Sequence, residues 1–337
     1  MLYTKSSNIE LHTWGDENEP DVVISKFISK KYNLFLTRFN LAFTKNIDKL
    51  VEQAKKHTLN GNLVLSALAS QELIGRYSKL DTSNSVVIDG GYGLLTRRGN
   101  YNRIAVFGRK ALLNANLPEL MKYVSLNRGD IFFDEVENKL KQYREEIFIN
   151  FYNSMPNPQK IGVENWIDLM YIRTKTPNLA AVNQNYMDSL CENYMPFAQP
   201  DILNLLLSIP VYLKKNSMIN KAIFAKFAPD LTKIPMEEYG FIIPFGYNHY
   251  RDYIYKKFIS ILKKPYQNQQ RYQILYTLKE YFFDIVESDI VRNSNIIDQN
   301  KIRKILHKYY NKNEKSYADT IGWWFTFNIW DEWKNRI

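Results

Sequence analysis

The feature that most limits the fold of this 337-residue chain is a short β-branched run followed by glycines. The run Val86–Ile88 leads directly into Asp89, Gly90 and Gly91. Three β-branched residues favour a buried strand, and paired glycines let the backbone approach a ligand at the carboxyl end of such a strand. The pattern therefore predicts a strand and a ligand-facing loop, although ordinary turns between a strand and a helix have the same composition.

Strand-like and helix-like patterns alternate through the first third of the chain. Ile9–Trp14 alternates like a strand, and turn residues then lead to Pro20, a residue favoured in the first turn of a helix. A helical pattern and a second strand-like run at Leu34–Phe39 follow, which predicts a β-α-β unit. Helices near 46–58 and 63–79 continue the alternation. The sequence therefore predicts an α/β part in which helices wrap a parallel sheet.

From about residue 112 onward, strand patterns become rare and helical periodicity dominates. The expected helices lie at 134–153, 162–173, 200–209, 219–228, 249–263, 268–288, 299–310 and 317–334. The last of these carries Trp323, Trp324 and Trp330, whose clustering favours packing in a core over stacking on a ligand. We therefore expect an α/β part at 1–111 and a mostly helical part at 112–337, packed together as one continuous domain.

The net charge of +10 is spread over many segments, and acidic residues interrupt the basic ones. This distribution favours solvated helix faces, including one at Lys214-Lys215, over a nucleic-acid interface. The longest apolar run, Ile202–Leu213, contains Pro210 and is too short to cross a bilayer. We expect a cytoplasmic protein with no membrane span and no nucleic-acid partner.

Cysteine and histidine usage bears on disulfides and metals. The single cysteine, Cys191, has no partner for a disulfide within the chain. The four histidines are scattered and show no ligand spacing with it, so no structural zinc site is expected.

Five segments occur in an order that matches one protein family. They are Thr13-Trp14-Gly15 with Pro20-Asp21, Asp89-Gly90-Gly91-Tyr92-Gly93-Leu94, Pro196–Pro210, Asn220–Phe224, and Tyr239-Gly240-Phe241 with Pro244. The chain resembles the synthetase domain of glutamine-dependent asparagine synthetases and related ATP-dependent amidotransferases. Pro196–Pro210 is the most specific segment, because it is similar to the family's Pro-Phe-Leu-Asp stretch and the helix after it without a gap.

The resemblance implies a fold and a reaction. The fold is a parallel sheet of the adenine-nucleotide alpha-hydrolase, or PP-loop ATPase, type, with its first strand missing here, followed by a helical half. The reaction uses ATP and magnesium, adenylates a substrate carboxylate and lets ammonia displace AMP. The implied acceptor is aspartate or a uronic acid of a bacterial surface polysaccharide.

The resemblance also implies roles for individual residues. Asp89 aligns with a carboxylate needed to form the acyl-adenylate, and Lys221 with a cation near the phosphates. Two alternatives stay open at this point: Asp89 as a residue that satisfies amides of its own turn, and Lys221 as a solvated lysine on an exposed helix face.

Further candidates come from the same segments. The residues expected at the nucleotide are Trp14, Gly90, Gly91 and Gly240, and those expected at the anionic substrate are Arg97 and Arg173. A strand-ending tryptophan is as often a plain core residue, and Arg97 and Arg98 also suit an exposed basic turn.

The chain departs from the family at several places. The family's Ser-Gly-Gly-x-Asp-Ser loop, which holds pyrophosphate after the first strand, has no counterpart, because residues 1–7 lead almost directly into the second strand. Tyr92-Gly93 replaces an Asp-Glu pair, and Glu237-Glu238 replaces a basic pair. Cys191 lies in the wrong place to serve as an amino-terminal glutaminase nucleophile.

Two functions therefore remain open. The first is an amide-forming ligase that works with an upstream subunit for the glutaminase or pyrophosphate loop. The second is a non-catalytic descendant that binds a partner or an acidic metabolite. Because a missing first strand leaves a sheet edge unpaired, we expect the chain to associate with such a subunit or with a second copy.

Overall fold

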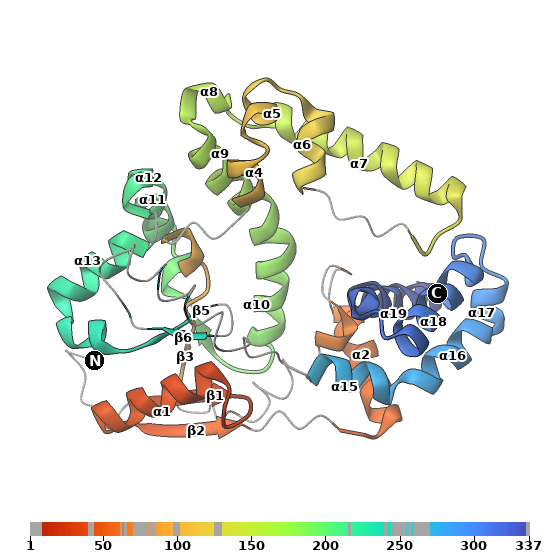
Figure 1. Cartoon of the computed structure of the whole chain (residues 1–337), viewed down its shortest axis with the longest axis horizontal. Helices are drawn as coiled ribbons and strands as arrows, with labels where there is room; N and C mark the ends of the chain where they lie inside the picture. Colours follow the sequence, from red (N-terminus) through yellow and green to blue (C-terminus); the bar gives the residue numbers. More distant parts are fainter. Residues whose placement is uncertain are drawn as a thin grey trace.

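The computed structural model describes residues 9–39, 44–60, 63, 66–69, 80, 85–96, 102–124, 130–214, 217–238, 241–243, 245, 254, 258 and 270–334. The strands are β1 (Glu10–Trp14), β2 (Phe35–Phe39), β3 (Val87–Ile88), β4 (Asn193–Tyr194), β5 (Met236–Glu238) and β6 (Phe241–Ile243). The α-helices are α1 (Pro20–Tyr32), α2 (Ile47–Asn60), α4 (Asn102–Val106), α5 (Arg109–Leu113), α6 (Leu117–Val124), α7 (Asp134–Ser154), α8 (Pro158–Ile161), α9 (Val163–Met170), α10 (Ala181–Asp188), α11 (Pro200–Ser208), α12 (Val211–Lys214), α13 (Met218–Phe227), α15 (Gln270–Thr277), α16 (Lys279–Glu287), α17 (Asp289–Arg292), α18 (Gln299–Lys312) and α19 (Ala318–Lys334). Shorter helical turns are η2 (Ala67–Ala69), η3 (Gly93–Thr96), η5 (Pro196–Ala198), η7 (Pro229–Lys233) and η8 (Lys315–Tyr317), and η4 (Tyr171–Ala180) is π-helical. Helices therefore make up most of the described chain (Figure 1).

The predicted β-α-β unit is confirmed at the amino-terminal end. Strands β1 and β2 pair in parallel, with Glu10 opposite Phe35, and α1 connects them. Pro20 begins α1, and Asn33 ends it in the left-handed conformation. Gly15 follows β1 with a φ of +116° and donates its N–H to Phe39 O at 3.2 Å. Only glycine adopts this backbone conformation without strain, so the residue fixes the exit from β1.

The remaining described strands form two further pairs. Strand β3 pairs in parallel with β4, and β5 and β6 form an antiparallel hairpin that packs against α1. No ladder between described residues joins the three pairs. The expected strand at 85–89 is confirmed as β3, but its partner is β4, which lies in the part of the chain where strands were not expected. The single parallel sheet of the PP-loop type stays a prediction.

Most of the helices expected after residue 112 are confirmed, with two differences. The helix expected at 162–173 passes from α9 into η4, where the chain widens around Pro177. A proline lacks the N–H for the usual helical bond and crowds the preceding turn, which a π-helical turn accommodates. The helix expected at 268–288 is divided into α15 and α16 at Leu278. The helices expected at 63–79 and 249–263 lie mostly outside the described residues.

The largest core joins α2 to the carboxyl-terminal helices α15–α19. Trp324 is 1% exposed, and Phe282 and Phe325 lie beside it with their ring centroids 5.2 Å apart. The core role predicted for the tryptophans is confirmed for Trp324 and for Trp323, which packs against this cluster. It is wrong for Trp333, which is 44% exposed, and Trp330 is only half-buried. A second core surrounds Trp166 between α4, α5, α6 and α9.

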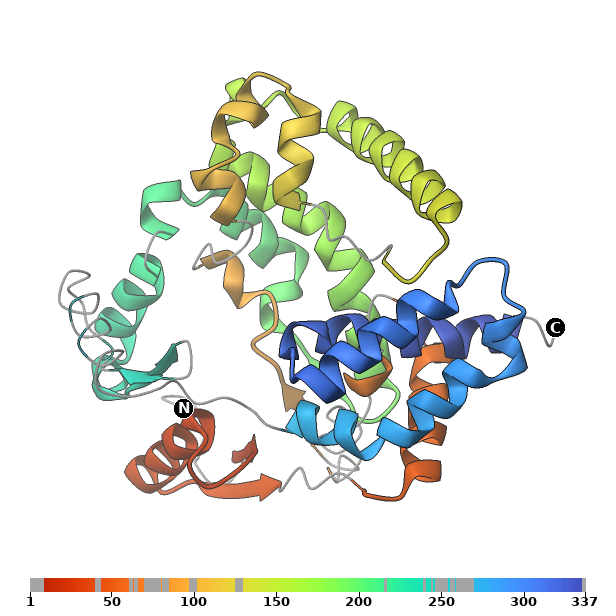
Figure 2. The ribbon, with the colours of Figure 1, turned by 45° about the vertical axis from the view of Figure 1, so that its right-hand side comes forward.

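Each of the four hydrophobic clusters combines residues from both sides of residue 111. The helical part therefore does not pack independently of the amino-terminal part in the described chain. The boundary at residue 111 stays a prediction. Both ribbon views show α7 along the outer edge, between the helices around α9 and the carboxyl-terminal helices (Figures 1 and 2).

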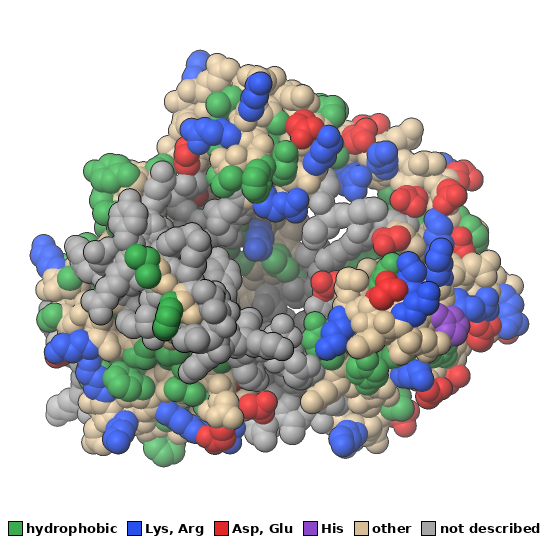
Figure 3. Space-filling model, in the orientation of Figure 1, with side chains coloured by type: hydrophobic (Ala, Val, Ile, Leu, Met, Phe, Trp, Pro, Cys, Tyr) green, Lys and Arg blue, Asp and Glu red, His purple; other side chains and the backbone are tan. Residues whose placement is uncertain are grey.

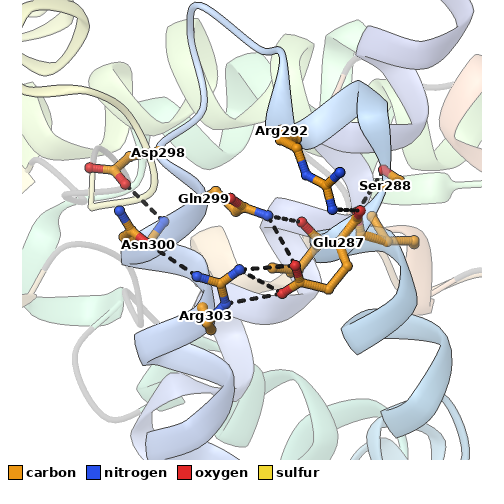
Figure 4. A network of polar contacts seen from close by, with 9 residues as sticks. Glu287, Ser288, Arg292, Asp298, Gln299, Asn300 and Arg303 are labelled. Carbon is orange, nitrogen blue, oxygen red and sulfur yellow. Dashed lines mark hydrogen bonds and ion pairs between the residues drawn. The ribbon is translucent and has the colours of Figure 1, made fainter.

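A polar network connects α16, α17 and α18 at the surface of the largest core (Figure 4). Glu287 accepts hydrogen bonds from Arg303 Nε at 3.0 Å and Nη2 at 2.7 Å. Asp298 caps α18 by accepting from the backbone N–H groups of Asn300 and Lys301. Such caps satisfy donors that have no partner within the helix. Among the described helices, none has the length and apolar character needed to pass through a membrane.

Candidate functional site

The loop after β3 begins with Asp89, which is held by backbone contacts on both sides. Its N–H donates to Tyr194 O at 3.0 Å, and its carboxylate accepts from Gly91 N at 2.6 Å. The second contact is the turn interaction expected of aspartate, so the alternative role of Asp89 as a turn former is confirmed. The contact also fixes the orientation of the carboxylate at the carboxyl end of β3.

The two glycines of this loop have different surroundings. A Cβ atom on Gly91 would lie 2.8 Å from Met195 Sδ, so the backbone approaches the segment after β4 closely. A Cβ atom on Gly90 would meet nothing within 4 Å, and Gly90 is exposed. Gly91 therefore serves packing, whereas the backbone of Gly90 is accessible from outside the protein.

Tyr92 packs where the resemblance predicts an acidic pair. Its φ is +66°, an unfavourable value for a side chain of this size, and its ring lies in a cluster with Leu95, Tyr171 and Phe197. Burial raises the pKa of the Tyr92 hydroxyl, and the neighbouring Thr176 opposes this shift. The loop is thus held down by an aromatic side chain.

Trp14 lies close to the same strand. It ends β1 and packs against the small cluster of Met187 and Cys191, as do Val87 of β3 and Leu190. Trp14 and β3 therefore share one hydrophobic cluster. Burial, and to a lesser degree the charge of Asp188, raises the pKa of the Cys191 thiol.

Lys221 lies on α13 and is only 8% exposed. Its Nζ atom is 5.8 Å from the centre of the Phe245 ring. The alternative that Lys221 is a solvated lysine is therefore wrong, because the α13 face that carries it is covered. No hydrogen bond or ion pair between Lys221 and Asp89 occurs in the described part of the chain.

A buried ion pair is the charged feature that sequence reasoning missed. Lys214 Nζ lies 3.0 Å from an oxygen of Asp168, and the two side chains are 1% and 5% exposed. The assignment of Lys214 to a solvated surface was wrong, because α12 turns this lysine toward α9. The sequence contained one signal of a buried charge, because Asp168 stands between Ile167 and Leu169 in an apolar helix.

The arginine candidates and the last glycine add little to the site. Arg173 is exposed and donates from Nη1 to Ser154 O at 3.1 Å, which attaches it to the end of α7. Arg97 and Gly240 lie outside the described residues. Within the described ranges, no three His, Cys, Asp or Glu side chains are grouped in a way that suits a metal ion.

The surface charges are mixed rather than separated. On the face drawn in Figure 3, basic and acidic side chains alternate over the helices at the right. No protein-family model, curated protein or solved structure matches this chain. The assignment of a site therefore depends on the contacts described above.

Proposed function

We propose that this chain is an asparagine synthetase-type domain that binds ATP and takes part in amide formation at a carboxylate. The observation that carries the proposal is that Trp14, at the end of β1, shares a hydrophobic cluster with Val87 of β3, which leads into the Asp89 loop. Ligands of α/β proteins bind at the carboxyl ends of strands, where loops of this kind meet. The acceptor would be aspartate or a uronic acid of a surface polysaccharide.

Lys221 supports a phosphate ligand in this proposal. The resemblance aligns this lysine with a cation near the phosphates. Gly90 would add an accessible backbone to the phosphate contacts. Magnesium is commonly held by phosphates with one or two carboxylates, and Asp89 is the carboxylate of this loop.

The test is calorimetric titration of the chain with ATP and magnesium. Lys221→Met should weaken ATP binding about tenfold or more, which is the loss expected when one charge-assisted contact is removed. Lys226→Met is the matched control, because Lys226 is exposed on the same helix and should leave binding unchanged. Equal binding by both variants, or no binding by the wild-type chain, would refute the proposal.

A second candidate function is a non-catalytic scaffold that binds a partner or an acidic metabolite. Two observations favour it: the Tyr92 ring occupies the position of the expected acidic pair, and Gly91 N engages the Asp89 carboxylate. Exchange of labelled pyrophosphate into ATP, measured with aspartate or glucuronic acid present, separates the two candidates. Absence of both ATP binding and exchange would support the scaffold, and carboxylate-dependent exchange would exclude it.

The proposal includes a location and a partner. A cytoplasmic location provides ATP, and the reducing environment there suits a chain whose single cysteine stays a thiol. The ligase function further requires a subunit that supplies ammonia and the pyrophosphate loop. The exchange assay needs no ammonia, because ammonia acts only after the acyl-adenylate has formed.

A further inference from the structure

The middle of α7 has an apolar stripe that nothing in the described structure covers. None of the 21 residues of this helix is buried. Leu140, Tyr143 and Ile147 are 46%, 62% and 67% exposed. Their spacing of three and four residues places them on one face, as in the contact seam of a two-helix coiled coil.

Both ends of α7 are anchored, which makes the exposed middle a rigid surface. At the amino-terminal end, Lys301 Nζ lies 2.5 Å from an oxygen of Asp134. At the other end, Phe151 and Tyr152 pack against Trp166 with ring centroids 6.3 and 5.8 Å away. The exposed stripe between these ends is therefore held in place before any partner binds.

We propose that α7 pairs with the α7 of a second copy of this chain in an antiparallel two-helix interface centred on Leu140 and Tyr143. In the antiparallel arrangement, Leu140 of one copy packs against Tyr143 of the other, and Ile147 extends the contact on both sides. A self-complementary patch of this kind forms a closed dimer with two-fold symmetry.

The charges beside the stripe determine the direction of the pairing. Lys139 directly precedes Leu140, and Glu146 directly precedes Ile147. These two positions face each other in an antiparallel pair, so Lys139 of one copy lies beside Glu146 of the other. On the other side, Glu137, which lies 3.6 Å from Lys301 of its own chain, would come beside Arg144. Each pair occurs twice through the symmetry, and every pair joins opposite charges.

The parallel arrangement is disfavoured by the same residues. It would place Lys139 of one helix beside Arg144 of the other, so that like charges meet. Glu146 is exposed, whereas Arg144 is half-buried and its Nε atom is covered. Lys139 contacts Glu135 of its own helix at 2.8 Å across an exposed surface, and such a contact is easily exchanged.

Charge reversal gives a specific test by sedimentation velocity over a wide range of protein concentrations. The wild-type chain should pass from monomer to dimer as its concentration rises. Lys139→Glu and Glu146→Lys should each weaken the dimer roughly tenfold, because every substitution turns two attractive pairs into repulsive ones. An equimolar mixture of the two variants should dimerise again, since each reversed charge then meets its opposite.

The control is Lys141→Glu, which changes the same charge on the opposite face of α7 and should leave the dimer unchanged. All of these side chains are exposed, so circular dichroism should show intact helices in every variant. A wild-type chain that stays monomeric would overturn the proposal and assign the stripe to a different partner. Variants that dimerise as well as the wild type, or a mixture that stays monomeric, would overturn it as well. The outcome is independent of ATP binding.

Discussion

Lys214 and Asp168 form an ion pair with a distance of 3.0 Å between nitrogen and oxygen, and almost no part of either side chain reaches the surface. The pair connects α12 to α9, and it therefore joins the segment before Lys221 to the helix that continues into η4. Transferring two charges from water to the interior is costly, so the contact depends on the presence of both partners.

Removal of one partner should be strongly destabilising. Asp168→Asn leaves the Lys214 ammonium buried without a counter-charge, and we expect a loss of about 3–5 kcal/mol in the free energy of unfolding. The double variant Asp168→Leu with Lys214→Met removes both charges and should recover most of this loss. Urea unfolding followed by circular dichroism measures both values.

The network in Figure 4 provides the control for this prediction. Glu287 and Arg303 are also closely paired, at 2.7 Å, but their side chains are 50% and 37% exposed. Glu287→Gln should therefore cost less than about 1 kcal/mol, as is usual for surface pairs. Equal losses in the free energy of unfolding for Asp168→Asn and Glu287→Gln would show that burial does not account for the contribution of the Lys214–Asp168 pair to stability.

His57 should make the stability of the protein depend on pH. The residue is 2% exposed, and burial lowers the pKa of its imidazole below the ordinary value near 6.5. The unfolded chain therefore binds a proton more readily than the folded one. The contribution is fully present above about pH 6.5 and is lost as the pH falls from there toward the lowered pKa of the folded state.

Urea unfolding at pH 7.5 and pH 5.5 tests this expectation. The wild-type chain should be less stable at the lower pH, and His57→Gln should reduce the difference. His307→Gln is the matched control, because His307 is exposed and its replacement should leave the pH dependence unchanged. A pH dependence that persists in full in His57→Gln would assign it to other groups.

Cys191 should react slowly with thiol reagents while the protein is folded. Its side chain is buried beside Trp14, and burial raises the pKa of the thiol, so little of the reactive thiolate is present. The rate of reaction with a maleimide should rise strongly in urea. A cysteine introduced by Ile88→Cys, at a position that is 74% exposed, should react rapidly in the folded state. Rapid labelling of Cys191 in the native wild-type chain would contradict the packing of this cluster.

Local patterns were sufficient to predict many elements, but not their partners. Pro20 and the alternation after Ile9 predicted the β-α-β unit, because these signals lie within the segments that they describe. The burial of Lys214 depends on Asp168, a residue 46 positions away, and local composition carries no such information. In the same way, the run Val86–Ile88 predicted a strand but not its pairing with residues 193–194.

The candidate site was predicted in part for the same reason. The resemblance predicted that Trp14 and the Asp89 loop belong to one site, and this stays a prediction. The turn made by the Asp89 carboxylate was one of two alternatives that the sequence left open. The burial of Lys221 could not be predicted from the sequence, since a lysine near the start of a helix is usually solvated and only tertiary packing covers this one.

Gly15 should be the most sensitive glycine of the described chain. Its φ of +116° is costly for any residue with a side chain, whereas the Glu19 carboxylate near a Cβ atom there is the flexible end of a side chain and can move aside. We expect Gly15→Ala to lower the free energy of unfolding by about 1–3 kcal/mol, because the strained turn at the exit from β1 is lost or forced. Gly90→Ala is the matched control and should change stability by less than about 0.5 kcal/mol, since a Cβ atom at that exposed position meets nothing within 4 Å. Thermal unfolding of the two variants under identical conditions compares them directly. Similar melting temperatures would mean that the turn after β1 adopts a different backbone conformation from the one described.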